Sequence, residues 1–183
     1  MVETVRPAIL LDVDGPLNPF RQGEKPRAPE YTMHLLRPKV FPGIAAKTLR
    51  VWLNPEHGEW LRELAEATGA ELVWATTWEG EANRLIGPVL GLPSLRSVSF
   101  GGMRIRHSGG RHGKLAGVVA WAGRRPLCWF DDDFQVGDED WAVERAAEGA
   151  PTRLIPVDPT VGLTREHIEI ARDFLDGLRE PGN

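Results

Sequence analysis

The chain has 183 residues with 42% hydrophobic and 26% charged residues, a composition typical of one folded globular domain over residues 1–183. It lacks the run of about 18 apolar residues that a membrane-spanning helix needs, and its net charge of −4 disfavours nonspecific binding to duplex DNA. The lone cysteine, Cys128, excludes an intramolecular disulfide and, without a secretory signal, favours a reduced, cytoplasmic setting.

Short apolar segments alternate with amphipathic ones along the chain. The expected strands are 8–13, 71–75, 95–100, 127–130 and 153–157. Between them we expect helices at 55–68 (capped by Asn54 and Gly69), at 79–90 with Pro88 ending or kinking it, from about Lys114, at 138–148 with Asp138 as cap, and at 164–178. This alternation predicts an α/β fold, a three-layer α/β/α sandwich with a parallel, Rossmann-like sheet.

Residues 16–53 interrupt the alternation and contain two extended pieces, 31–36 and 48–53. We interpret them as a small β-hairpin insertion after the first strand. It is either a cap or flap over a site at the sheet edge or an ordered excursion without a role. Basic residues gather here, which suits a phosphorylated substrate or an ordinary solvated surface: Arg21, Lys25, Arg27, Arg37, Lys39, Lys47 and Arg50.

Acidic residues follow two of the expected strands. Asp12 and Asp14 end the first strand, and Asp131 and Asp132 end the strand at 127–130. In parallel α/β sheets ligands bind beyond the carboxyl ends of the strands, so these groups are expected to converge. Their mutual repulsion is relieved by a hard divalent cation, and oxygen-only ligands suit Mg²⁺. For Asp133, Asp138 and Asp140 a turn or helix-cap role is the simpler interpretation.

The segment 12–17, DVDGPL, resembles motif I of the haloacid dehalogenase (HAD) superfamily. Thr76 resembles motif II, Lys114 motif III and the pair Asp131-Asp132 the acidic motif IV, all in the family's order. We choose Thr76 rather than the adjacent Thr77 as the motif II residue, because strand alternation and the position of the motif favour Thr76. The second acid, Asp14, points to the phosphatase branch rather than the dehalogenases, although Pro16 stands where many phosphatases have Thr.

The resemblance implies a Mg²⁺-dependent phosphatase, a hydrolase acting through an aspartyl-phosphate intermediate. Asp12 is then the nucleophile, and Asp14 protonates the leaving oxygen and later activates water. The metal would be held by the carboxylates of Asp12 and Asp131 and the backbone carbonyl of Asp14, with Asp132 binding a metal water or orienting Lys114. Thr76 and Lys114 would bind the substrate phosphate.

Two alternatives stay open: a phosphotransferase using the same residues, and a noncatalytic binding or regulatory module with this fold. The substrate is expected to be a phosphorylated small molecule, a nucleotide or a nucleic acid end. Trp78, directly after motif II, is expected near the mouth of the site, where stacking on a base is one possible role and core packing the other.

The segment 108–115, SGGRHGKL, lacks the first Gly and the final Ser/Thr of a P-loop and is interpreted as a loop that delivers Lys114. Within it, Arg111 and His112 are more often solvated loop residues than phosphate ligands. His57 and His167 fall in the first turns of expected helices and are predicted to be on the surface.

Overall fold

The computed structural model describes residues 5–20, 28–39, 48–101 and 109–179. Its centre is a parallel sheet with strand order β5-β4-β1-β6-β7. The strands are β1 (Ala8–Leu11), β4 (Glu71–Trp74), β5 (Arg96–Ser97), β6 (Leu127–Asp131) and β7 (Thr152–Pro156). The predicted parallel sheet is confirmed.

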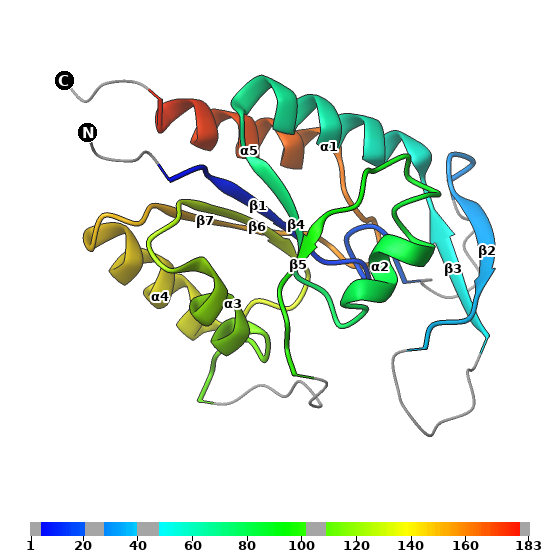
Figure 1. The fold of residues 1–183 in the computed structure, drawn as a ribbon, viewed down its shortest axis with the longest axis horizontal. Coiled ribbons are helices and arrows are strands. Elements are labelled where there is room, and N and C mark those ends of the chain that lie inside the picture. The colour runs from blue at the N-terminus through cyan, green and yellow to red at the C-terminus, as the bar shows by residue number, and fades with distance from the viewer. Residues whose placement is uncertain (1–4, 21–27, 40–47, 102–108, 180–183) are drawn as a thin grey trace.

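Helices cover both faces of the sheet, as Figure 1 shows. On one face lie α1 (Pro55–Thr68) and α5 (Arg165–Gly177), and on the other lie α3 (Leu115–Ala122) and α4 (Val136–Ala147). The short α2 (Gly80–Leu85) lies beyond the carboxyl end of β4. The three-layer sandwich predicted from the sequence is therefore present. No described helix is long and apolar enough to cross a membrane.

The central strand β1 is buried on both faces because its side chains alternate between two cores. Ile9 and Leu11 pack in the cluster that includes α1 and α5, while Ala8 and Leu10 pack in the cluster that includes α3 and α4. All four residues are at most 1% exposed. Burial on both faces explains why the strand is continuously apolar.

The insertion contains an antiparallel hairpin of β2 (Thr32–Leu36) and β3 (Leu49–Leu53), close to the two extended pieces predicted. Val51 and Leu53 are buried in the α1 and α5 core. The hydroxyl of Tyr31, at the base of the hairpin, donates to the carbonyl of Val161 at 3.2 Å. The hairpin is thus attached to the domain on two sides. Arg21, Lys25, Arg27 and Lys47 lie outside the described residues.

Several element boundaries differ from those predicted. Helix α1 has the expected caps, since the Asn54 side chain accepts from Glu56 N at 3.0 Å and Gly69 adopts a left-handed φ of 71°. The edge strand predicted at 95–100 shrinks to Arg96–Ser97, and the helix predicted to reach 90 ends at Leu85 and continues as turns.

The prediction that Asp138 is the N-cap of α4 was wrong, because the helix begins earlier in the chain. The cap is Gln135, and Asp138 is the third helical residue of a capping box. Its carboxylate accepts from the backbone N–H of Gln135 at 2.8 Å and also from His112. Asp138 is fully buried, so this structural role also holds the loop before α3 against α4.

The prediction of a surface position for His57 was also wrong. The side chain is 1% exposed and lies between the rings of Tyr31 and Trp60, at centroid distances of 5.6 and 5.1 Å. Burial lowers its pKa to about 4, because the charged form cannot be solvated there. His57 is therefore part of the contact between α1 and the base of the hairpin.

The burial of His57 predicts a pH-dependent stability. Between pH 6.5 and 4 the unfolded chain binds a proton at this side chain that the folded chain does not bind, so acid destabilises the fold. Wild type is expected to lose roughly 2–3 kcal/mol more of its unfolding free energy than His57→Phe between pH 7 and 4.5. Urea titrations at both pH values measure this, with His34→Phe as a control. Equal losses in wild type and His57→Phe would refute the assignment.

Candidate active site

The carboxyl ends of β1 and β6 bring the predicted acidic residues together with Lys114. Asp12 directly follows β1 and Asp131 is the last residue of β6. The Lys114 Nζ lies 2.6 Å from Asp12 Oδ2 and 2.7 Å from Asp131 Oδ2. All three residues are buried, at 6% exposure or less. One ammonium group thus bridges two carboxylates from neighbouring strands, as the topology predicted.

Three carboxylates form a cluster that suits a hard cation. Ligand atoms of Asp12, Asp131 and Asp132 all lie within 4.8 Å of one another. Gly15 has a φ of 92°, and a Cβ there would lie 2.5 Å from the Asp132 carboxyl carbon. The two loops therefore meet so closely that position 15 requires glycine. An all-oxygen set of this kind fits Mg²⁺.

The cluster carries more negative charge than Lys114 alone can neutralise. Burial, opposed by Lys114 and reinforced by Asp131, raises the pKa of Asp12 to about 7. Burial together with the charge of Asp131 raises the pKa of Asp132 to about 6. The mutual repulsion of these carboxylates is relieved by protonation or by a bound cation.

Asp131 is the carboxylate held most firmly in its charged form. Burial would raise its pKa, but Lys114 and a hydrogen bond from His112 outweigh burial and lower it. The two carboxylates in turn outweigh burial at Lys114 and raise its pKa. Lys114 therefore pairs with Asp131 and Asp12, and among the interactions of the described residues it forms no ion pair with Asp132.

Asp14 lies beside the cluster and is oriented by two donors. Trp78 Nε1 donates to Asp14 Oδ2 at 2.8 Å, and Asn18 Nδ2 donates to Asp14 Oδ1 at 2.8 Å. The hydrogen bond to Asp14 confirms that Trp78 lies near the site. Trp78 is only 4% exposed, however, and its ring packs in the core rather than lying open for stacking. Asn18 Oδ1 accepts from the backbone N–H of Trp52, which links Asp14 to the hairpin.

The two threonines after β4 have different surroundings. Thr76 is fully buried, and its Oγ1 accepts from Trp78 N at 3.4 Å. Thr77 is exposed. The burial of Thr76 agrees with its side chain facing into the fold at the strand end, and its phosphate-binding role stays a prediction.

His112 is a residue of the site, and the prediction that it is a solvated loop residue was wrong. It is 4% exposed, and its Nε2 lies 2.9 Å from Asp131 Oδ1. Its Nδ1 accepts from the backbone N–H of Lys114 at 2.9 Å, which leaves the ring hydrogen on Nε2 to be donated to Asp131. The only sign of this role in the sequence is that His112 lies two residues before Lys114. Its partner Asp131 is distant in sequence, so the contact could not be predicted.

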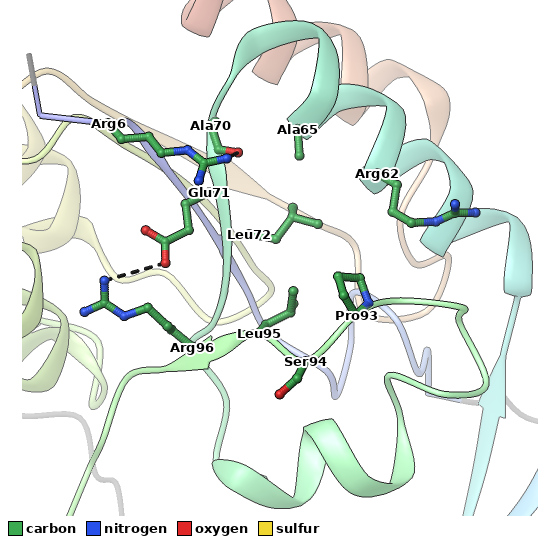
Figure 2. Close-up of a pocket in the computed structure, with 10 residues that line it drawn as sticks. All are labelled: Arg6, Arg62, Ala65, Ala70, Glu71, Leu72, Pro93, Ser94, Leu95 and Arg96. Atoms are coloured by element: carbon green, nitrogen blue, oxygen red, sulfur yellow. Dashed lines mark hydrogen bonds and ion pairs between the residues drawn. The ribbon is translucent and has the colours of Figure 1, made fainter.

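A separate cavity of about 320 Å³ lies at the amino ends of β4 and β5, away from the carboxyl ends that carry the carboxylates (Figure 2). Apolar side chains form its floor, and Arg96 on its rim pairs with Glu71 at 3.6 Å. Its lining residues are Arg6, Arg62, Ala65, Ala70, Glu71, Leu72, Pro93, Ser94, Leu95 and Arg96. None of the residues of the four predicted motifs lines this cavity. The motif residues meet at the carboxylate cluster instead, which is therefore the candidate active site.

Residues 8–168 match the model of a family described as the HAD domain in Swiss Army Knife RNA repair proteins. No curated protein and no solved structure matches the chain. The matched region contains the sheet, the hairpin and all four motifs. HAD domains are generally hydrolases, and members typically use Mg²⁺, in agreement with the carboxylate cluster. The chain therefore belongs to this HAD domain family of Swiss Army Knife RNA repair proteins, and so to the HAD superfamily.

Proposed function

We propose that this protein is a Mg²⁺-dependent phosphatase that acts through an aspartyl-phosphate on Asp12. The observation that carries the proposal is the bridge of Lys114 between Asp12 and Asp131, beside Asp132. A buried carboxylate beside a fixed cation suits attack on an anionic phosphoryl group, because the cation offsets the charge that builds up.

The reaction needs two steps. In the first, an Asp12 oxygen bonds to phosphorus while the bond to the leaving oxygen breaks, and Asp14 supplies the proton that this oxygen takes up. In the second, Asp14 removes a proton from water, whose oxygen bonds to phosphorus and releases Asp12. Trp78 and Asn18 keep the Asp14 carboxyl in a fixed orientation for both transfers.

The residues present fit a magnesium ion. Asp12, Asp131 and Asp132 would hold it, together with the Asp14 backbone carbonyl that the family resemblance implies. When bound, Mg²⁺ neutralises the carboxylates and withdraws charge from the phosphoryl oxygens. Lys114 supplies a second positive charge that is independent of the metal, and Thr76 hydrogen-bonds a phosphoryl oxygen.

The family description suggests the substrate class. Proteins of this family are described as RNA repair proteins, and we propose a phosphorylated RNA end as the substrate of this chain. Asp12 is 6% exposed, so a protruding terminal phosphate suits its position better than a phosphate inside a duplex.

Wild-type protein is expected to hydrolyse p-nitrophenyl phosphate only when Mg²⁺ is added. Asp14→Asn should slow the first step, formation of the aspartyl-phosphate, by about 10²-fold or more on an RNA terminal phosphate but by less than about tenfold on p-nitrophenyl phosphate, whose acidic leaving group needs no proton. The first-turnover burst of leaving-group release on each substrate measures this step apart from the second step, which needs Asp14 on both substrates. Equal losses would contradict the acid role, and transfer to an added alcohol without phosphate release would make the protein a phosphotransferase.

His112 is expected to act on metal affinity through Asp131. His112→Phe removes the hydrogen bond to the carboxylate and should raise the Mg²⁺ concentration for half-maximal activity by about tenfold, while kcat at saturating Mg²⁺ changes much less. His112→Gln retains a donor and should restore part of the affinity. A loss of kcat without a change in the Mg²⁺ requirement would contradict this positioning role.

A further inference from the structure

The β2–β3 hairpin has two chemically different faces. Cross-strand pairs such as Met33 with Trp52 and Leu35 with Arg50 share one face, while His34 with Val51 share the other. Val51 is 1% exposed and packs in the core. The opposite side, here called the open hairpin face, consists of Met33, Leu35, Arg37, Arg50 and Trp52.

The open hairpin face combines apolar and cationic side chains. Met33 and Leu35 are 45% and 61% exposed, and Trp52 is half-buried. Arg37 and Arg50 are exposed on the same side, and Arg37 donates to Thr48 Oγ1 across the hairpin at 3.0 Å.

The open hairpin face is held next to the candidate active site. The backbone N–H of Trp52 donates to Asn18 Oδ1 at 2.8 Å, and Asn18 donates to Asp14. From the other side, Arg84 donates to the backbone carbonyl of Arg37 at 3.0 Å. Strand β3 is therefore attached through Asn18 to the loop that carries Asp12 and Asp14, which places the hairpin beside the carboxylate site.

We infer that the open hairpin face binds the terminal nucleotides of a single-stranded polynucleotide whose end phosphate enters the carboxylate site. This inference rests on the proposed function and names the surface that selects the substrate. Bases stack on Trp52 and against Met33 and Leu35, and backbone phosphates pair with Arg50 and Arg37.

Charge complementarity favours this occupant over a protein. In the described hairpin segments 28–39 and 48–53, three residues are cationic (Arg37, Lys39 and Arg50) and one, Glu30, is acidic. The whole chain has a net charge of −4, so positive charge is concentrated locally against the overall balance. A single strand fits better than a duplex, because the terminal phosphate must reach the buried Asp12.

Binding is tested without catalysis, in EDTA at low salt. The probes are fluorescein-labelled ten-nucleotide single-stranded RNAs with a 5′- or a 3′-phosphate at the unlabelled end, and fluorescence anisotropy gives Kd. Arg50→Glu and Trp52→Ala are each expected to raise Kd about tenfold for at least one probe. Arg62→Glu, which makes the same charge change at an exposed position of helix α1, is the matched control and should stay within about twofold of wild type.

Activity assays in Mg²⁺ separate this inference from the proposed function. On the phosphorylated RNA, Arg50→Glu should raise KM about tenfold more than it does on p-nitrophenyl phosphate. RNA binding in EDTA by a protein that hydrolyses neither substrate would refute the phosphatase proposal and keep the binding surface. The surface is refuted if wild type does not bind the RNAs, if blunt duplex RNA binds equally well, or if Arg62→Glu weakens binding as much as Arg50→Glu.

Discussion

Asp12→Asn is expected to lower kcat for phosphate release by about 10³-fold or more, equivalent to about 4 kcal/mol of lost transition-state stabilisation. An amide oxygen is a poor nucleophile towards phosphorus, so no phosphorylated enzyme forms. The fold should persist, because Asn has nearly the same size and Lys114 keeps its contact with Asp131. Steady-state kinetics with p-nitrophenyl phosphate and Mg²⁺ measures the activity, and thermal unfolding measures the stability.

Asp140→Asn is the matched control for this variant, because Asp140 is an exposed aspartate on α4, outside the carboxylate cluster. It should retain wild-type rates. Substantial turnover by Asp12→Asn would remove Asp12 from the nucleophile role and require the site to be reassigned. Trapping of radiolabelled phosphate on wild type but not on Asp12→Asn would support the covalent intermediate directly.

Lys114→Met is expected to have the largest effect on stability. It leaves Asp12 and Asp131 buried next to each other without their cation, and breaking a buried ion pair in this way costs about 3–5 kcal/mol. Turnover should also fall below detection. Urea unfolding in EDTA at pH 8 measures the loss, with Lys39→Met as the control, because Lys39 is an exposed lysine on the hairpin segment.

The loss in Lys114→Met should depend on pH in a defined direction. Without Lys114, the folded state raises the pKa of both carboxylates above their unfolded values, so the folded state binds more protons and its stability falls as pH rises. The difference from wild type is therefore expected to be smaller at pH 5 than at pH 8. Added Mg²⁺ should restore part of the stability at pH 8. A difference that does not change with pH or Mg²⁺ would show that lost packing, not charge, is responsible.

The sequence was informative where function depends on strand ends. Asp12 and Asp131 follow runs that are apolar at every position, and such runs identify strands buried on both faces. In a parallel sheet all carboxyl ends lie at one edge, so topology predicted that these carboxylates converge, while Lys114 was placed with them by its resemblance to motif III. Helix α1 was predicted for a different reason: its caps are local and depend only on Asn54 and Gly69.

The environment of the side chains could not be predicted in the same way. Trp78 and His112 lie in loops, and the burial of each depends on segments distant in sequence: Asp14 for the indole N–H, and Asp131 and Asp138 for the imidazole and its backbone. His57 was misplaced because a histidine in a first helical turn is usually solvated, whereas here Tyr31 covers it. Long-range contacts decided these three cases.

The order of strands in the sheet has a consequence for how the protein is made. The first strand, β1, occupies the middle position and pairs with β4 and β6, whose registers place Ala8 beside Glu71 and Leu127. On the ribosome, β1 is therefore synthesised before the strands it pairs with, and it acquires its second neighbour only after β6 at Leu127–Asp131 has been made. Pairings so distant in sequence form slowly and leave apolar surface exposed meanwhile. Newly made chains of this protein are thus most vulnerable to aggregation at β1, the strand that Asp12 follows.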